Sequence, residues 1–384
     1  MAQHEELVKP VYDSPYSLYG LACGLAAFFG VKRDCLTRPL ELAGRRLALV
    51  YLDALSWNLF EKASPQVSGK VIKATTVFPS TTSAALATLM TAQTPGEHGL
   101  LGYQVYNKLL GGVVNLIKYS YAGEQAAGTL SQVRPLSEAF PVRPWLAETE
   151  AKVHAIMSSG ASSGELTRAF LQLRPSEGLT TIRPYNSPYE MLALLREAAS
   201  EGSADLIYVY YDNPDHVGHI FGFESGATDL IVEEVREVVN HLDSIARSYG
   251  DRYTFVLMSD HGQVTVTRTF VFNDDADLLR RLEVPPYGDS RAVWFRSRED
   301  VGDVLRSRYG MVVFSRSEVE GEGLLGRVDD FVRSNVMGDF LGVAPDRSTK
   351  YLYLYRPNDA SLRLKGNHSG MSDDEMHIPI IVWG

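Results

Sequence analysis

Residues 205–219 read DLIYVYYDNPDHVGH, and this stretch decides the fold class. Its first seven residues are almost continuously apolar after the opening acid, as expected of a strand covered on both faces of a sheet. The chain then passes at once into two acids and two histidines around a proline and a glycine. In an open α/β sheet the ligand crevice lies at the carboxyl ends of the strands. The stretch therefore predicts a parallel sheet with a functional site at its edge.

Similar strands recur along the chain and alternate with helical patterns. Five more short apolar runs have this character: 46–52, 70–78, 152–158, 253–259 and 378–383. The clearest helix is 228–249, which has a single apolar stripe. This stripe consists of Ile231, Val235, Val238, Leu242 and Ile245. Such alternation predicts an α/β fold with a mainly parallel central sheet and helices on both faces.

The segment 268–365 interrupts this alternation, because its strand-like runs are separated by charged helical pieces. We interpret it as an inserted α+β cap subdomain. The catalytic α/β core is then expected to comprise residues 46–267 and 366–384. Residues 1–45 are expected to form a helical extension packed on that core.

The apolar run at 14–30 could be mistaken for a membrane or signal segment. It is shorter than the roughly 20 residues that cross a bilayer, and acids rather than bases precede it. Ser14 as the N-cap, Pro15 at the first helical position and Gly30 just past the end predict a buried helix of a soluble protein. A cytoplasmic location is therefore expected.

Charge and cysteine content narrow the classes of function. The formal net charge of -10 argues against a general binder of nucleic acid or of membrane surfaces. We expect neither a nucleic-acid polymer nor a membrane as partner.

The two cysteines, Cys23 and Cys35, form no CxxC motif. Reduced thiols are the simplest interpretation, and a disulfide between these two is the alternative.

Side chains with metal-ligand chemistry follow four of the predicted strands and precede the last one. They are Asp53, Thr82, Asp215, His219, Asp260, His261 and His368. A single Asp after a strand is usually a turn or cap residue. Three Asp and three His at one edge of a sheet, with a hydroxyl beside them, instead indicate a metal site. Carboxylate oxygen and imidazole nitrogen suit a pair of divalent ions, zinc (Zn²⁺) or else Mn²⁺.

Thr82 lies in FPSTTSAALATLMTA (78–92), where a strand ends and a helix is expected to begin. The free backbone N–H groups and the positive dipole end of a helix start hold an anion. The structural alternative is that Thr82 only caps the helix. A divalent ion lowers the pKa of a bound hydroxyl and makes it a nucleophile. Two metals, a hydroxyl and amide donors together suit displacement at phosphorus.

These motifs resemble the alkaline phosphatase superfamily, and within it the type I phosphodiesterase/nucleotide pyrophosphatase family. The resemblance is carried by VYLDAL, FPSTTSAALATLMTAQTPGEHGLLGY, DNPDHVGH, SDHG and GNHSG followed by IPIIV, in family order. It implies an alkaline phosphatase-like core, two divalent metals and a covalent intermediate on Thr82. It also assigns two ligand sets: Asp53, Thr82, Asp260 and His261 beside the nucleophile, and Asp215, His219 and His368 at the second metal.

One position departs from the family pattern. After EHG the family typically carries an Asn that binds a phosphoryl oxygen, whereas EHGLLGY places Tyr103 near that position as the expected substrate-binding residue. The expected substrate is a small phosphate ester or nucleotide, and hydrolysis of a diester or pyrophosphate is the first interpretation. The alternatives are a phosphate monoesterase, a phosphonate hydrolase, a mutase, and a binding protein that keeps metals for structure only.

Overall fold

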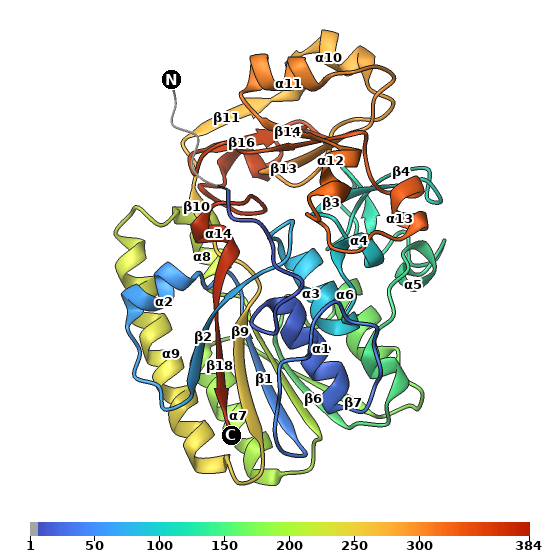
Figure 1. Cartoon of the computed structure of the whole chain (residues 1–384). Coiled ribbons are helices and arrows are strands. Elements are labelled where there is room, and N and C mark those ends of the chain that lie inside the picture. Colours follow the sequence, from blue (N-terminus) through green and yellow to red (C-terminus); the bar gives the residue numbers. More distant parts are fainter. Residues whose placement is uncertain (1–6) are drawn as a thin grey trace.

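The computed structural model describes residues 7–384 and has a seven-stranded central sheet with strand order β2-β18-β9-β1-β8-β6-β7 (Figure 1). These strands are β1 (Leu47–Leu52), β2 (Lys70–Thr75), β6 (Val153–Ser158), β7 (Thr180–Tyr185), β8 (Leu206–Tyr211), β9 (Thr254–Ser259) and β18 (His377–Trp383). β1 is parallel to β8 and β9, and β6 is parallel to β7 and β8. β18 runs antiparallel to β2 and β9. The predicted mainly parallel sheet is confirmed.

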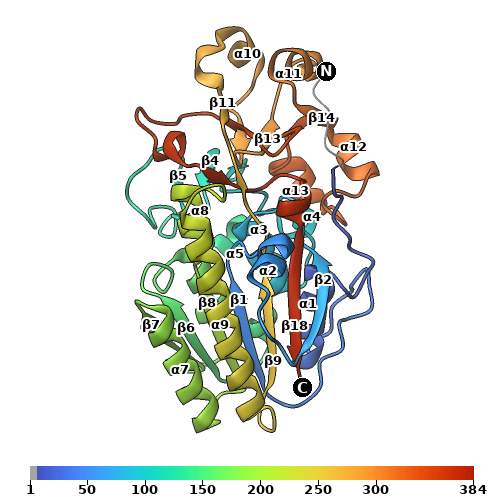
Figure 2. The same ribbon diagram turned by 90° about the vertical axis from the view of Figure 1, so that its left-hand side faces the viewer.

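Helices cover both faces of this sheet (Figure 2). One face carries α2 (Trp57–Ala63), α7 (Pro188–Glu201) and α9 (Ala227–Tyr249), and the other carries α1 (Leu18–Phe28) and α3 (Thr82–Thr91). Side chains alternate along β1 as strand geometry requires. Leu47, Leu49 and Tyr51 pack with α1 and α3, while Ala48, Val50 and Leu52 pack with α7 and α9. The predicted apolar stripe of α9 is buried throughout.

The N-terminal helix is present, but its cap differs from the prediction. Ser17, not Ser14, is the N-cap, and its Oγ accepts a hydrogen bond of 3.0 Å from the N–H of Gly20. Ser14 lies three residues earlier, where its carbonyl accepts a hydrogen bond from the Ser17 hydroxyl. Within residues 7–384, no helix is both long enough and apolar enough to span a bilayer. Residues 1–6 of the expected N-terminal extension lie outside the described residues.

The two cysteines form a disulfide between α1 and the loop that follows it. The expectation of reduced thiols is therefore wrong. After Gly30 the chain turns back along α1, and the N–H of Leu40 donates to the carbonyl of Gly20 at 3.0 Å. This return brings Cys35 beside Cys23, a proximity that the spacing of the two residues alone does not reveal.

A second seven-stranded sheet lies above the carboxyl edge of the first, in the order β14-β15-β13-β12-β3-β4-β5 (Figure 1). Its strands are β3 (Gln104–Asn107), β4 (Gly112–Asn115), β5 (Ser120–Tyr121), β12 (Tyr287–Gly288), β13 (Ala292–Phe295), β14 (Val312–Ser315) and β15 (Phe340–Val343). The sheet combines strands from the predicted insert with strands from residues 104–121. β12 joins the two parts by pairing Gly288 with Gln104. The domain boundaries at 268 and 365 stay a prediction.

Two short ladders lie at the base of the insert, where the chain leaves the core and returns to it. β10 (Val264–Thr265) pairs antiparallel with β17 (Gly366–Asn367), and β11 (Arg268–Val271) pairs parallel with β16 (Thr349–Leu352). The two ends of the insert therefore lie side by side. This pairing places residue 368 close to residue 261, although 106 residues separate them.

The remaining helices are short. Around the site and the second sheet they are α4 (Pro95–His98), α5 (Leu136–Ala139), α6 (Glu165–Thr167), α8 (Asp215–Phe221) and α14 (Asp373–Met376). Within the insert they are α10 (Ala276–Arg281), α11 (Gly302–Tyr309), α12 (Arg316–Gly321) and α13 (Asp330–Asn335).

Candidate metal centre

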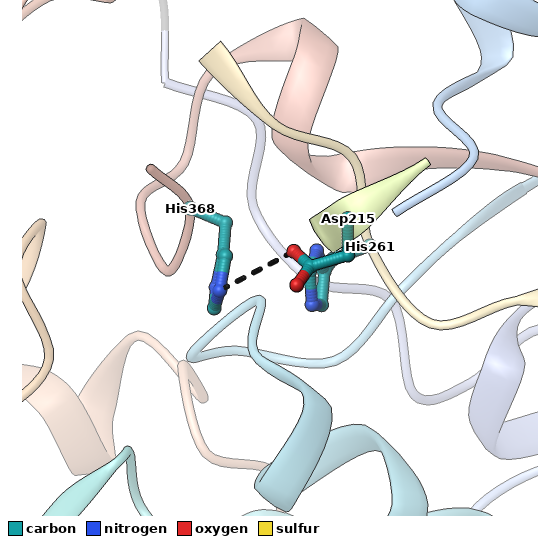
Figure 3. A group of neighbouring side chains, drawn as sticks. All are labelled: Asp215, His261 and His368. Atoms are coloured by element: carbon teal, nitrogen blue, oxygen red, sulfur yellow. Dashed lines mark ion pairs between the residues drawn. The ribbon is translucent and has the colours of Figure 1, made fainter. Parts of the chain in front are cut away.

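The structure brings the predicted ligands together at the carboxyl edge of the central sheet. Ligand atoms of Asp53, Asp260 and His261 lie within 4.8 Å of one another, and so do those of Asp215, His261 and His368. Figure 3 shows the second group, in which the carboxylate of Asp215 faces the His368 ring. The two groups share His261, so they form one continuous cluster.

The candidate aspartate ligands follow the ends of central strands, whereas His368 follows β17. Asp53 directly follows β1, and its N–H donates to the carbonyl of Tyr211 at the end of β8 at 2.9 Å. The N–H of Asp215 in turn lies 3.2 Å from the carbonyl of Asp53. Asp215 begins α8, and His219 follows one turn later with its Nε2 3.3 Å from Asp215 Oδ2. The four-residue spacing thus places both side chains on the same face of a helix.

Asp260 and His261 follow β9, and the chain turns at Gly262 so that both side chains face the cluster. A Cβ at Gly262 would lie 1.8 Å from the carbonyl oxygen of Asp374. The close backbone approach therefore requires glycine at this position. His261 Nε2 lies 3.1 Å from Asp260 Oδ2 and 3.6 Å from Asp53 Oδ1.

Thr82 is the first residue of α3, and Thr81 occupies the N-cap position. The capping alternative for Thr82 therefore has no support in the geometry. Its Oγ1 lies 3.2 Å from His261 Nε2, at the border of the ligand cluster. The hydroxyl is thus placed next to the site, at a helix start where backbone N–H groups lack intrahelical partners.

The three histidines are oriented in the same way. Their Nδ1 atoms lie 2.8 Å from the carbonyl of Gly366 (His219), 2.9 Å from that of Gly262 (His261) and 3.2 Å from that of Ser80 (His368). A carbonyl only accepts, so Nδ1 carries the hydrogen and Nε2 faces the carboxylates. A backbone acceptor on one ring nitrogen is the usual support for a histidine that binds metal through the other.

The two inner carboxylates each have one oxygen held by the protein and one without a donor. Tyr210 donates its hydroxyl to Asp53 Oδ2, and the N–H of Ala54 donates to Asp260 Oδ1 at 3.0 Å. Asp53 Oδ1 and Asp260 Oδ2 are both buried, and among the described residues neither has a hydrogen-bond partner unless His261, whose Nε2 lies 3.6 Å and 3.1 Å away, is protonated. Leaving such acceptors unsatisfied is costly. A divalent cation bound between them would satisfy both oxygens, so the residues fit a metal.

The electrostatics of the cluster also favour a bound cation. Burial, with the nearby carboxylates of Asp260 and Asp215, raises the pKa of Asp53 well above its ordinary value. Burial opposes the charge of His261, but the Asp260 carboxylate outweighs it and raises the pKa of His261 to about 9. Burial and the neighbouring His261 lower the pKa of His368 to about 3. Without a metal ion, the negative charge of the cluster therefore keeps a proton bound to one of its side chains.

Several contacts at the site were not predicted from the sequence. Gln263 donates from its Nε2 to Asp215 Oδ1 at 2.8 Å, and Tyr210 supports Asp53. Asp289, from the insert, accepts hydrogen bonds at Oδ2 from the Thr81 hydroxyl at 2.9 Å and from the N–H of Tyr103 at 3.2 Å. Gln263 lies two residues beyond a ligand, which is a weak signal. Nothing in the sequence marks Asp289.

The predicted substrate residue, Tyr103, lies near Thr82 rather than within the cluster of candidate ligands. The N–H of Tyr103 donates a hydrogen bond to Asp289 Oδ2, which also accepts one from the hydroxyl of Thr81, the residue before Thr82. The tyrosine is 41% exposed, so its ring is accessible to a small molecule.

Fold and site together define an α/β protein with a candidate metal centre beside a threonine hydroxyl. The chain belongs to the type I phosphodiesterase / nucleotide pyrophosphatase family, whose pattern matches residues 47–340. The resemblance found in the motifs is thereby confirmed. Members of this family are phosphodiesterase- or pyrophosphatase-type hydrolases.

Individual relatives match shorter segments. The chain is 38% identical over 71 residues to human ectonucleotide pyrophosphatase/phosphodiesterase family member 7, covering 18% of this chain and 16% of that protein. It is 27% identical over 187 residues to the 2,3-bisphosphoglycerate-independent phosphoglycerate mutase of Staphylococcus haemolyticus, covering 47% of this chain and 35% of that protein. The matched part thus spans only a minor share of these curated relatives.

Solved structures share the fold over most of the chain. An inactive variant of murine ectonucleotide pyrophosphatase / phosphodiesterase 5 in complex with AMP superimposes with a TM-score of 0.62 at 17% identity, covering 89% of this chain and 88% of that one. Phosphonoacetate hydrolase from Sinorhizobium meliloti in complex with phosphonoacetate gives 0.61 at 14% identity, covering 88% and 90%. At these identities the likeness establishes the fold.

Proposed function

We propose that the chain is a metal-dependent phosphoric ester hydrolase, acting as a nucleotide phosphodiesterase/pyrophosphatase through a covalent phospho-threonine on Thr82. One observation carries this proposal. Three imidazole Nε2 atoms and two donor-free carboxylate oxygens face the same small region, and the Thr82 hydroxyl lies 3.2 Å from one of those nitrogens. Membership of the family supports the same class of reaction.

The proposed ligand sets follow the two groups defined by the geometry, except that His219 takes the place of His261 beside Asp215 and His368, since its Nε2 lies 3.3 Å from Asp215 Oδ2. Asp53, Asp260 and His261 would hold one ion next to Thr82, and Asp215, His219 and His368 would hold the other. We expect zinc, with Mn²⁺ as the alternative, because carboxylate and imidazole ligands suit both. Bound ions supply Lewis-acid polarisation of the phosphoryl oxygens and favour the deprotonated hydroxyl.

The chain itself supplies the nucleophile and its orientation. Thr82 Oγ1 loses its proton and attacks phosphorus, a bond from Oγ1 to phosphorus forms, and the bond to the leaving alcohol or phosphate breaks as the leaving oxygen takes up a proton. Water then releases the phosphoryl group and restores the hydroxyl. The free N–H groups at the start of α3 face the transferred group and stabilise its negative oxygens. His261 Nε2 lies 3.2 Å from Oγ1 and 3.6 Å from Asp53 Oδ1, so it borders the position from which Oγ1 attacks.

A diester or pyrophosphate is favoured over a monoester by the charge beside the nucleophile. Asp289 lies against Thr81, one residue from Thr82. A monoester dianion carries one more negative charge than a diester, and a nearby carboxylate disfavours that extra charge. The proposed substrate class is therefore a small phosphodiester or a nucleotide pyrophosphate.

A substrate panel tests this proposal. The protein would be stripped of metal, reloaded with Zn²⁺ or Mn²⁺, and assayed with bis-p-nitrophenyl phosphate, p-nitrophenyl phosphate, phosphonoacetate, dinucleotides, nucleotide sugars and nucleoside triphosphates. We expect the diester to be preferred over the monoester by about a thousandfold, equivalent to about 4 kcal/mol of transition-state discrimination. A preference for the monoester or for phosphonoacetate would overturn the substrate assignment.

Two further outcomes separate the other classes. Hydrolysis in ¹⁸O-labelled water should place label in the released phosphate, whereas a mutase would return the phosphoryl group to an alcohol. Sequence similarity to a phosphoglycerate mutase makes this control necessary. Metal binding without turnover of any phosphoester would indicate a binding protein.

A further inference from the structure

Three consecutive residues of the insert contact the core at three places around the site. Asp289, Ser290 and Arg291 connect β12 to β13 in the second sheet. Asp289 contacts the segment before Thr82, Ser290 contacts Asn367, and Arg291 contacts the loop that carries His368. We call these three residues the docking segment.

The contact of Asp289 with Thr81 replaces the usual function of an N-cap residue. A threonine at the N-cap ordinarily accepts a hydrogen bond from an N–H of the first helical turn. Thr81 makes no such side-chain bond. Its hydroxyl instead donates to Asp289 Oδ2, which also accepts from the N–H of Tyr103. The side chain adjacent to the nucleophile is therefore used to attach the insert and not to cap the helix.

The contact of Arg291 is fully buried. Arg291 and Glu375 form an ion pair of 2.7 Å with side-chain exposures of 1% and 0%. Glu375 also accepts the N–H of Gly370 at 2.8 Å, and the N–H of Arg291 donates to Ser369 Oγ at 3.1 Å. Both contacted residues lie directly after His368.

The conformation of this loop requires such support. Ser369 has a φ of 92°, a left-handed value that residues other than glycine rarely adopt. A strained backbone of this kind persists only where the surrounding structure fixes it. Ser290 adds a hydrogen bond of 2.9 Å between its Oγ and Asn367 Oδ1 on the other side of His368.

We propose that the docking segment is a positioning element of the active site. Asp289 fixes Thr82 through Thr81, and Ser290 and Arg291 fix His368 through the residues on either side of it. The catalytic consequence rests on the proposed function, whereas the positioning of the two loops does not. The insert is then part of the catalytic apparatus and not only a cover above it.

The smallest change that tests the contact between Asp289 and Thr81 is Thr81→Val, which keeps the shape of the side chain and removes the hydrogen-bond donor. Displacing a reacting group by about 1 Å costs roughly a hundredfold in rate. We expect Thr81→Val and Asp289→Ala to lower kcat with bis-p-nitrophenyl phosphate by about ten- to a hundredfold, with KM within a few-fold of wild type. Thr81→Ser keeps the hydroxyl and should restore most of kcat.

The matched control is Asp339→Ala. Asp339 also binds one backbone N–H and one side chain, from Ser297 at 2.9 Å and Arg316 at 2.8 Å, but both partners belong to the insert. If Asp289 only stabilised the fold, Asp339→Ala and Asp289→Ala would change kcat to the same extent. We expect Asp339→Ala to leave kcat within a few-fold of wild type.

Hydrogen–deuterium exchange of the metal-free protein provides a readout independent of turnover. Thr81→Val should increase exchange in peptides covering 78–84, and Ser290→Ala should increase it in peptides covering 366–372, while Asp339→Ala changes neither. Unchanged exchange in 78–84 for Thr81→Val, or a loss of kcat that Thr81→Ser shares, overturns the proposal. If wild type hydrolyses no phosphoester, the proposed function fails and the exchange result alone decides the positioning.

Discussion

Glu375→Gln removes one charge of the buried pair that joins the insert to the core. The Glu375 carboxylate accepts hydrogen bonds from Arg291 at 2.7 and 3.0 Å, from the N–H of Gly370 at 2.8 Å and from the Ser372 hydroxyl at 2.7 Å. Glutamine keeps the volume of the Glu375 side chain, but its N–H₂ group replaces one of the two carboxylate oxygens that accept these hydrogen bonds. Arg291 then stays buried but loses the carboxylate with which it pairs.

The expected loss follows from the burial of the pair. Removing one partner of a buried ion pair costs about 3–5 kcal/mol. With about 2.1 cal/mol/K of unfolding entropy per residue, 384 residues give about 0.8 kcal/mol/K, so the melting temperature should fall by about 4–6 °C. The assay is differential scanning calorimetry at pH 7.

The control is Glu320→Gln, which breaks the partly exposed pair of Glu320 with Arg333, 2.8 Å apart. Pairs of this kind contribute about 0–1 kcal/mol, so the melting temperature should move by about 1 °C or less. An equal shift for both variants would refute the reasoning, because burial would then have no effect.

The pH dependence supplies a second check on the same variant. Burial favours the protonated form of Glu375, but the Arg291 guanidinium outweighs it and holds the pKa of Glu375 below its ordinary value. A carboxyl whose pKa is depressed on folding contributes stability above its unfolded pKa of about 4.3, and loses it as the pH falls through the folded value. The difference in melting temperature between wild type and Glu375→Gln should therefore shrink below about pH 4. A constant difference down to pH 3 would contradict the assignment.

Four other outcomes are expected. Thr82→Ala should lower kcat by about a thousandfold or more while metal content by elemental analysis stays near wild type; near-normal turnover would remove Thr82 as nucleophile. His219→Ala should bind about one metal ion fewer per chain, and undiminished metal would contradict its role as a ligand. Chelation should abolish turnover and Zn²⁺ or Mn²⁺ should restore it, whereas turnover by verified metal-free protein would exclude metal dependence. Tyr103→Phe should raise KM about two- to tenfold if the phenol donates one hydrogen bond to substrate, and an unchanged KM would remove that contact.

The sequence predicted most of the central sheet because its inner strands, such as β1, β8 and β9, are buried on both faces. A continuously apolar run such as 205–211 is a strong local signal. β7 was missed because it lies at the edge of the sheet, where Thr180–Tyr185 is largely polar and contains Pro184. Proline is tolerated at edge strands, but its presence weakens any prediction of a strand.

The site was predictable to the same extent as the strands that carry it. Asp53, Asp215 and Asp260 follow strands at predictable distances, and parallel strands direct their carboxyl ends to one edge. The residues that support them could not be found in this way. Asp289 and Tyr210 reach the site through contacts between segments that are distant in sequence, and no local pattern encodes such contacts. The disulfide between Cys23 and Cys35 was only the alternative, because their separation of 12 residues does not reveal that the chain turns back along α1.

The position of the insert accounts for its contribution to the site. It departs from the core at residue 268 and returns at residue 365, so in the chain it lies between His261 and His368, two candidate ligands of the same cluster. Pairing of Val264 with Asn367 closes it at its base, and the rings of His261 and His368 lie 4.0 Å apart. A long insertion closed in this way adds little loop entropy, because that cost grows only with the logarithm of length. The loop carrying His368 is thus set by contacts that the insert itself provides. A change in the second sheet that displaced Arg291 would therefore move His368 relative to His261, and insertions or deletions in β13 should alter metal content even though they lie outside the ligand cluster.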